Sequence, residues 1–198
     1  MASFKVVLLG EGGVGKSSFL FRYIDGLFRS EYVATMRLDF NIKEVHVAGQ
    51  LVKLQIWDTV GQERQNRTAL AKSYVRGANG CVLLFDVTNR ATFEVVSEWV
   101  RIYRDYTGAQ TEADNIVLAG NKTDLQANRQ VAREEAEEKA RELGAVYFET
   151  SAKTGEEVDA AFLALAKEML KGRPAGQPLR NSVSLQRPQP KKKHCCRS

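Results

Sequence analysis

The sequence is poor in several residue types, and each shortage excludes a class of protein. It contains three cysteines, Cys81 within an apolar run and the adjacent Cys195 and Cys196 near the end. This spacing is no disulfide framework, so we expect a reducing compartment. No apolar run approaches the roughly 20 residues of a spanning helix, and the first residues lack the pattern of a signal peptide. Attachment to a membrane would need another feature.

Acidic residues are missing from the C-terminal segment. Residues 171–198 contain eight Lys or Arg and no Asp or Glu, whereas residues 1–170 contain 21 basic and 24 acidic residues. The net charge of +5 therefore belongs to the last segment. A nucleic-acid-binding domain needs basic residues on a folded face, so we expect no nucleic-acid partner. A membrane surface suits a basic tail better.

The remaining composition indicates one folded domain. With 198 residues and 43% hydrophobic content, we expect a domain over residues 1–170 and, over the Gly-, Pro-, Gln- and Ser-rich residues 171–198, a flexible basic tail. Apolar runs at residues 6–9, 82–85 and 116–119 are typical of parallel strands buried on both faces. Helical periodicity at residues 93–103 and 158–169 alternates with them, which predicts right-handed crossovers.

One pair of strands breaks this alternation. Residues 39–47 and 51–58 are joined by residues 48–50, a connection too short for a parallel crossover. They predict an antiparallel hairpin at the sheet edge. The expected fold is α/β, a mixed, mostly parallel sheet of about six strands with helices on both faces and ligands at the carboxyl ends of the strands.

A glycine-rich loop follows the first predicted strand. Residues 10–17, GEGGVGKS, fit the phosphate-loop pattern G-x-x-x-x-G-K-[ST] and open an amphipathic helix. The glycines let backbone N–H groups surround phosphates, Lys16 reaches the β- and γ-phosphates, and the Ser17 hydroxyl ligates Mg²⁺. The predicted phosphate-binding residues are Gly12, Gly13, Val14, Gly15, Lys16, Ser17 and Ser18. ATPases and kinases share this loop, so it does not identify the base.

Two later motifs identify the base. Residues 121–124, NKTD, follow the fifth predicted strand, and Ser151, Ala152 and Lys153 follow the sixth. These residues resemble the NKxD and SAK motifs of Ras-like GTPases. The Asp124 carboxylate can accept hydrogen bonds from guanine N1–H and from its exocyclic amine, whereas adenine has no donor at either place, which disfavours an ATP-using phosphotransferase.

The resemblance to Ras-like small GTPases covers residues 4 to about 170, and three features are similar to the Rab branch. These are residues 53–59, KLQIWDT, residues 74–78, YVRGA, and the terminal Cys195 and Cys196. The resemblance implies a P-loop NTPase fold and a Rab-like membrane-trafficking switch that binds GTP or GDP with Mg²⁺ and hydrolyses GTP. It also implies that the Ala152 N–H meets guanine O6, that Asn121 ties its loop to the phosphate loop, and that Lys122 and Phe28 flank the base.

Further residues receive roles by the same resemblance. At the Mg²⁺ site with Ser17, Thr35 completes the coordination only when a γ-phosphate is present, and Asp58 holds a metal-bound water. The Gly61 N–H touches the γ-phosphate, and Gln62 orients the attacking water while Lys16 absorbs charge. Arg29, Arg37 and Arg64 are expected to be solvated rather than to act as an arginine finger. Phe40, Trp57 and Tyr74 occupy the positions of an effector-facing aromatic triad. The alternative for these three, above all for Tyr74, is a place in the core.

Two departures from the Rab pattern limit these inferences. Met36, Arg37 and Leu38 stand where Ile-Gly-Val is usual, which affects the effector face. Val60 stands where Ala is usual and adds a β-branched residue beside Gly61. Two alternatives stay open: a nucleotide-binding scaffold with little hydrolysis, and a Ras-like signalling GTPase outside vesicle traffic.

The last eight residues, KKKHCCRS, are compatible with a nuclear-import run, a metal-binding tract or a solvated charge run. By resemblance to Rab endings, both Cys195 and Cys196 carry geranylgeranyl chains. Arg197 occupies a position that is usually aliphatic in a C-a-a-X box, so we favour double modification over one farnesyl chain. This predicts the cytoplasmic face of endomembranes or the plasma membrane, with a cytosolic pool.

The resemblance also implies a set of protein partners. We expect a monomer that meets a guanine nucleotide exchange factor, a GTPase-activating protein and effectors that bind the switch regions. The prenylation machinery and a GDP dissociation inhibitor would act on the tail.

Overall fold

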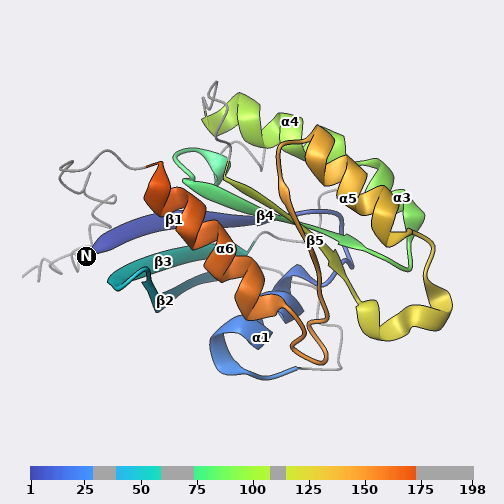
Figure 1. Ribbon diagram of the computed structural model, residues 1–198, viewed down its shortest axis with the longest axis horizontal. Coiled ribbons are helices and arrows are strands. Elements are labelled where there is room, and N and C mark those ends of the chain that lie inside the picture. Colours follow the sequence, from blue (N-terminus) through green and yellow to red (C-terminus); the bar gives the residue numbers. More distant parts are fainter. Residues whose placement is uncertain (29–38, 59–73, 108–114, 173–198) are drawn as a thin grey trace, which may run out of the picture.

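The computed structural model describes residues 1–28, 39–58, 74–107 and 115–172 (Figure 1). Its strands are β1 Ala2–Leu9, β2 Asp39–Val47, β3 Gln50–Asp58, β4 Gly80–Asp86, β5 Ile116–Asn121 and β6 Val146–Glu149. Its helices are α1 Lys16–Asp25, α3 Arg90–Glu94, α4 Val96–Thr107, α5 Arg133–Glu142 and α6 Val158–Lys171, with the 3₁₀ helix η1 at Thr123–Asn128.

The strands form one six-stranded sheet in the order β2-β3-β1-β4-β5-β6. Strand β2 pairs antiparallel with β3, and every other neighbouring pair is parallel. The two residues between β2 and β3, Ala48 and Gly49, both have positive φ values, 48° and 77°, as tight hairpin turns require. The mixed, mostly parallel sheet and its edge hairpin are therefore confirmed.

Each face of the sheet is covered by helices, because successive residues of a strand point to opposite faces. In β1, Val6 and Leu8 belong to a core with α1 and α6, whereas Val7 and Leu9 belong to a second core with α3, α4 and α5. Figure 1 shows these two groups of helices on opposite sides of the strands. The apolar runs at residues 6–9, 82–85 and 116–119 are thus buried on both faces of the sheet, as predicted.

The helical segment predicted at residues 93–103 is two helices rather than one. All four positions of its periodicity, Phe93, Val96, Val100 and Tyr103, are buried, but the chain leaves helical geometry at Val95 (φ −91°, ψ 3°). Adjacent β-branched residues are stiff and poor helix formers, and two of them, Val95 and Val96, lie at the break. The apolar period identified the buried face but not the break.

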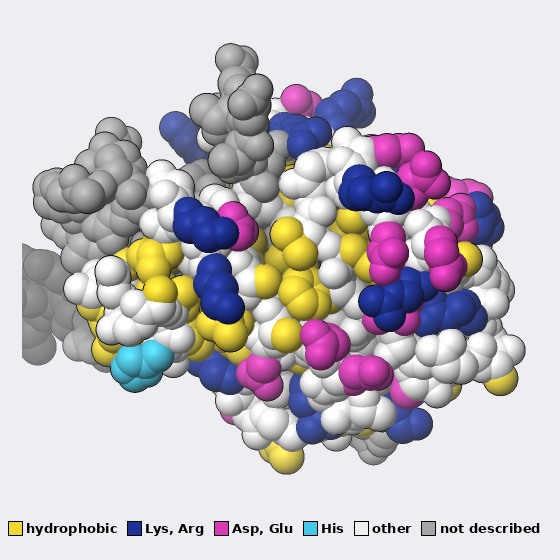
Figure 2. Space-filling model, viewed as in Figure 1, with side chains coloured by type: hydrophobic (Ala, Val, Ile, Leu, Met, Phe, Trp, Pro, Cys, Tyr) yellow, Lys and Arg dark blue, Asp and Glu magenta, His cyan; other side chains and the backbone are white. Residues whose placement is uncertain are grey.

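The surface mixes charges of both signs. Figure 2 shows Lys and Arg side chains interspersed with Asp and Glu on the face in view. On α5, Arg133 pairs with Glu137 at 2.8 Å and Lys139 with Glu142 at 2.5 Å. Such exposed pairs contribute only about 0–1 kcal/mol each, so the buried cores hold the fold together.

Within the described ranges, none of the helices combines the length and the apolar character that crossing a lipid bilayer requires.

Candidate functional site

The predicted site residues converge because parallel strands end at one edge of the sheet. The register pairs Val7 with Trp57, so Asp58 ends β3 beside the last residues of β1. It also pairs Asp86 with Asn121, which places the ends of β4 and β5 together. The loops after β1, β5 and β6 therefore lie at the same edge, although the first is more than 100 residues from the other two in the sequence.

The loop after β1 depends on glycine geometry. Gly10 has φ +132°, and a Cβ added there would lie 2.1 Å from the Leu84 carbonyl oxygen of β4, so no other residue fits without separating the strands. Gly13 also has positive φ, +82°, but a Cβ there would meet nothing within 4 Å. The loop leads directly into α1 at Lys16, whose first turn presents backbone N–H groups and the positive end of the helix dipole. This is the geometry of an anion cradle.

Lys16 lies inside this loop. It is only 5% exposed, and its ammonium donates hydrogen bonds to the carbonyl oxygens of Gly10 at 2.6 Å and Glu11 at 3.0 Å. A buried ammonium needs such partners, because burial without them is strongly unfavourable. The loop carbonyls therefore hold the cationic group among the residues predicted to contact phosphate.

Asn121 connects the loop after β5 to both other loops. Its amide donates to the Val14 carbonyl at 2.8 Å, and its carbonyl oxygen accepts the Ala152 N–H at 3.1 Å. A Cβ on Gly15 would lie 2.6 Å from the Asn121 amide nitrogen, so Gly15 leaves the space that this connection needs. The Ala152 N–H, predicted to meet guanine O6, would therefore be shared between that oxygen and Asn121.

Asp124 is oriented by the loop after β6. Its side chain is 13% exposed and lies 3.8 Å from the Lys153 ammonium, and one carboxylate oxygen accepts the Ser151 hydroxyl at 2.7 Å. The neighbouring Thr123 binds the Thr150 carbonyl through its N–H at 3.2 Å and its hydroxyl at 3.1 Å. A carboxylate has about four acceptor positions, so capacity remains for further donors.

Lys122 bridges two segments. It has a positive φ of 70°, and its ammonium donates to the Gly13 carbonyl at 2.8 Å and pairs with Asp86 at 2.7 Å. Asp86 also accepts hydrogen bonds from the Thr88 N–H and hydroxyl. Our sequence reasoning did not identify Asp86; its position at the end of a buried parallel strand was the available signal.

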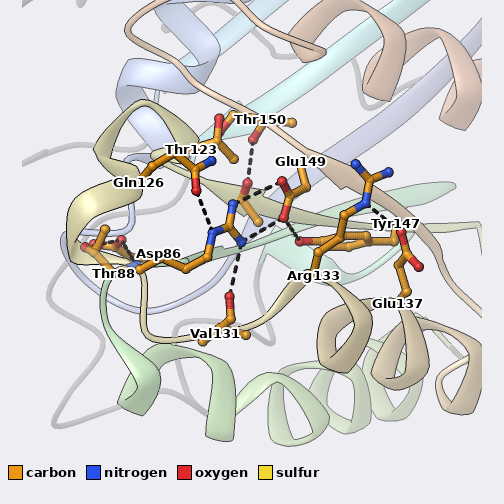
Figure 3. Close-up of polar contacts among 12 residues, drawn as sticks. Asp86, Thr88, Thr123, Gln126, Val131, Arg133, Glu137, Tyr147, Glu149 and Thr150 are labelled. Carbon is orange, nitrogen blue, oxygen red and sulfur yellow. Dashed lines mark hydrogen bonds and ion pairs between the residues drawn. The ribbon is translucent and has the colours of Figure 1, made fainter.

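A bidentate ion pair connects the segment after η1 to the end of β6. Arg129, just after η1, donates to both oxygens of Glu149 at 2.8 and 3.0 Å, and Glu149 ends β6 two residues before Ser151. Arg129 also donates to Gln126 at 3.0 Å and to the Val131 carbonyl at 3.1 Å. Figure 3 shows Glu149 between Tyr147 and the segment of Thr123 and Gln126.

Tyr147 extends this ion pair into the sheet. Its hydroxyl donates to Glu149 at 3.2 Å, and burial, followed by the nearby Glu149 carboxylate, raises the pKa of this hydroxyl well above its usual value. The phenol thus keeps its proton and remains a donor. The sequence offered no periodic or motif signal for this cluster.

The described residues predicted to bind Mg²⁺ fit a hard cation. Ser17, partly buried on the first turn of α1, offers a hydroxyl, and Asp58, 1% exposed at the end of β3, offers a carboxylate. Both offer an oxygen atom as a metal ligand at the edge of the sheet that carries the phosphate loop, and Mg²⁺ prefers oxygen ligands. The third predicted ligand, Thr35, lies outside the described residues.

The three aromatic positions are not equivalent. Phe40 is 42% exposed and its ring lies 4.9 Å from that of Trp57, which the Lys5 ammonium covers at 5.0 Å. Tyr74 is only 5% exposed and packs in the core with α3, α4 and α5. For Tyr74 the structure thus gives the core placement that the sequence left open. Phe28, predicted to flank the base, is 39% exposed just after α1.

Other predicted residues lie outside the described ranges. These are the predicted site residues Thr35, Gly61, Gln62, Cys195 and Cys196, the departures from the Rab pattern at Met36, Arg37, Leu38 and Val60, and the two further arginines Arg29 and Arg64.

Comparison with known proteins identifies the fold and the class. The model of the Ras family matches residues 5–171. The chain belongs to the Ras family. Among its relatives, Ras-related protein Rab-10 of Diplobatis ommata is 41% identical over 182 residues, covering 92% of this chain and 88% of the relative. Human Ras-related protein Rab-37 is 43% identical over 198 residues, covering 97% of this chain and 85% of the relative.

The similarity extends to plants. The GTP-binding protein YPTM2 of Zea mays is 40% identical over 202 residues, covering 98% of this chain and 96% of the relative. From these matches, the chain is a Rab-like small GTPase of the Ras family with the Ras-like P-loop GTPase fold. Its family consists of GTP hydrolases, and its Rab relatives support a role in membrane traffic.

Proposed function

We propose that this Ras-family chain binds GTP or GDP with Mg²⁺ at the carboxyl edge of its sheet and acts as a Rab-like switch on membranes. The observation that carries the proposal is the position of Asn121, which bonds Val14 of the phosphate loop and Ala152 of the loop after β6. One side chain thereby joins the two halves of a nucleotide site.

Asp124 selects guanine in this proposal. Ser151 and Lys153 orient its carboxylate, which accepts hydrogen bonds from guanine N1–H and from the exocyclic amine. Adenine would leave these acceptors unpaired in a partly buried site, a loss that disfavours its binding strongly. Asn121, Lys122, Ala152 and Phe28 complete the base-binding group.

The phosphates are assigned to residues 12–18. Backbone N–H groups of the loop, the N-terminus of α1 and the Lys16 ammonium would surround them. Ser17, Asp58 and Thr35 would hold Mg²⁺, which when bound supplies positive charge to phosphate oxygens. Lys16 would exchange contacts with loop carbonyls for contacts with phosphate oxygens.

Gln62 is proposed to orient the water in hydrolysis. The Gly61 N–H would contact the γ-phosphate, and Thr35 would bind Mg²⁺ only while that phosphate is present, so both segments would respond to its loss. Regulators follow from this cycle: an exchange factor, a GTPase-activating protein and effectors that meet Phe40 and Trp57. An activating protein would raise the slow intrinsic rate by roughly 10³ to 10⁵.

The test begins with the nucleotide that copurifies with the chain. Denaturing the purified protein should release GDP or GTP, and adenine nucleotide in its place would overturn the guanine assignment. Single-turnover hydrolysis of bound GTP should then proceed slowly in the parent and more slowly in Gln62→Leu at nearly equal GTP affinity. Equal rates would remove Gln62 from catalysis, and an inactive parent would favour the scaffold alternative, to which Val60 points.

The tail would attach the switch to membranes. We propose that residues 171–198 form a basic tether beyond the domain of residues 1–170 and that geranylgeranyl chains on Cys195 and Cys196 anchor it, since one lipid chain alone gives marginal binding. A GDP dissociation inhibitor would then maintain a cytosolic pool. Intact-mass analysis of protein from a eukaryotic cell should show two lipid additions. An unmodified C-terminus, or a doubly Cys→Ser protein that remains on membranes, would contradict this.

A further inference from the structure

Arg22, in the last turn of α1, makes contacts that the predicted site does not include. Its guanidinium donates three hydrogen bonds to backbone carbonyls: Nε to Ala152 at 2.8 Å, Nη2 to Lys153 at 2.5 Å and Nη1 to Gly26 at 2.6 Å. The planar guanidinium has five donors on three nitrogens in a fixed geometry, so it can reach separated carbonyls that the donors of an ammonium, all on one nitrogen, cannot. One side chain thus fixes two segments to α1.

Both segments belong to the base side of the proposed site, that is, to the residues assigned to guanine. Ala152 and Lys153 lie between β6 and α6, in the turn that Figure 1 shows close to α1. The same turn contains Ser151, whose hydroxyl bonds Asp124, and Gly155, whose backbone lies against the Arg22 stem: a Cβ there would be 3.5 Å from the Arg22 Cδ. Arg22 therefore braces the turn that orients Asp124.

The third carbonyl lies on the way to Phe28. Gly26 ends α1 in the left-handed region (φ 68°), and its N–H donates back to the Arg22 carbonyl at 3.0 Å. Arg22 and Gly26 therefore hold each other through one bond in each direction, two residues before Phe28. This fixes where the chain leaves α1 toward the residue assigned to the base.

Helix α1 also begins in the phosphate loop, at Lys16. A rigid helix therefore connects the proposed phosphate cradle at its N-terminus to Arg22 near its C-terminus. We infer that Arg22 is a positioning residue: it holds the turn of residues 151–155 and the segment leading to Phe28 against α1, and thereby sets the residence time of bound guanine nucleotide. This inference deepens the proposed function and rests on it.

The experiment uses the full chain loaded with GDP that carries a fluorescent group on its ribose. Displacement by excess GDP with Mg²⁺ present gives the release rate. Arg22→Gln should accelerate release about tenfold or more, because one charge-assisted hydrogen bond is worth that factor. Arg22→Lys retains the charge but not the planar group of donors, so its release rate should lie between those of the parent and Arg22→Gln. This variant replaces Arg22→Gln in the test if Arg22→Gln does not fold.

Arg104→Gln is the matched control. Arg104 also donates from its guanidinium to a backbone carbonyl, that of Leu143 at 3.0 Å, but it lies on α4 and outside the proposed site. This variant should release GDP at the parental rate. A similar acceleration in Arg104→Gln would show that general loss of stability, and not positioning, explains the effect.

A second measurement separates positioning from structural support. Inosine diphosphate lacks the exocyclic amine assigned to Asp124, so a misplaced turn should narrow the preference for GDP over this analogue by about threefold or more in Arg22→Gln. Removal of Mg²⁺ by a chelator should accelerate release by the same factor in the parent and the variant, because the metal-binding residues are unchanged.

Parental release and parental preference in both Arg22 variants would overturn the inference. Faster release with an unchanged preference for GDP would also overturn it, since that result indicates structural support alone. A parent chain that binds no guanine nucleotide would instead overturn the proposed function, and the inference with it.

Discussion

The phosphate side and the base side of the proposed site are built by different means. On the phosphate side, residues 10–16 form a continuous segment in which Gly10, Gly13 and Gly15 have positive φ values and the backbone presents most of the polar groups. On the base side, side chains bond to groups of other segments, as when Ser151 donates to the Asp124 carboxylate and Asn121 donates to the Val14 carbonyl.

This difference determines how each side can fail. A continuous loop is damaged by added atoms or by backbone strain at a single residue. A side chain network is damaged by the loss of one partner, because the group left behind stays buried without its hydrogen bond. The two sides should therefore respond to different substitutions.

The largest effect is expected on the base side, from Asp124→Asn. Replacing the acceptor carboxylate with an amide leaves the guanine donors unmatched, which should reduce the preference for guanine by roughly 10⁴-fold. Xanthine nucleotides should gain affinity, because their 2-oxo group accepts from an amide. Competition between GDP and xanthosine diphosphate measures the change. Undiminished GDP affinity would contradict the role of Asp124 in selecting guanine.

The next effect, from Gly15→Ala, is expected where the two sides meet. The added Cβ would lie 2.6 Å from the Asn121 amide nitrogen, at a residue with φ +97°. Strain of about 1–3 kcal/mol and displacement of Asn121 should weaken GDP binding about tenfold to a hundredfold.

Gly144→Ala is the control for this substitution. Gly144 also has positive φ, +63°, but a Cβ there would meet nothing within 4 Å. Titration calorimetry should find parental GDP affinity in Gly144→Ala despite lower stability. If Gly144→Ala lowers GDP affinity as much as Gly15→Ala does, backbone strain alone explains the lower affinity and the contact with Asn121 does not matter.

A smaller effect is expected from the ion pair that supports the base side. Arg129 and Glu149 side chains are 19% and 17% exposed and bond through two parallel hydrogen bonds. A double-mutant cycle with Arg129→Gln and Glu149→Gln should give a coupling energy of about 1–3 kcal/mol in urea unfolding. The α5 pair Arg133–Glu137, 62% and 45% exposed, should give less than about 0.5 kcal/mol. Equal couplings would show that burial gives Arg129 no advantage.

The smallest effect concerns Cys81, which lies in the core that packs against α3, α4 and α5. Burial raises the pKa of the Cys81 thiol on β4 above its ordinary value of 9.0, so the folded state binds this proton more tightly than the unfolded state. That stabilisation is complete below pH 9 and is lost as the pH rises above it, by up to about 1.4 kcal/mol per pH unit.

The background for this measurement is a chain with Cys195→Ser and Cys196→Ser, in which Cys81 is the remaining cysteine. Its free energy of unfolding should decline from pH 9 to 10.5 more steeply than that of the same chain with Cys81→Ala. Parallel slopes would mean that the thiol is not protected by the core. An alkylating reagent should likewise label Cys81 only after unfolding.

Much of the fold could be predicted because its signals are local. The apolar run at residues 116–119 predicted β5, and the short connection at residues 48–50 predicted the antiparallel hairpin. The break at Val95 was missed because the apolar period continues across it. The phosphate loop has a fixed spacing, since one continuous backbone must surround one ligand, so residues 10–17 identified it.

By itself, the sequence predicted the buried apolar strands, the edge hairpin, the phosphate-loop pattern, the separation of the basic segment 171–198 and the resemblance to a family. Only the tertiary structure decided that Arg22 holds the carbonyls of Ala152 and Lys153, that Arg129 pairs with Glu149, and that Tyr74 lies in the core. The physical reason is that these partners lie in different segments. Spacing constrains residues that share one loop, whereas Arg22 and Ala152 are 130 residues apart and Arg129 and Glu149 are 20 apart, so each pair meets only when the sheet and its helices have packed together.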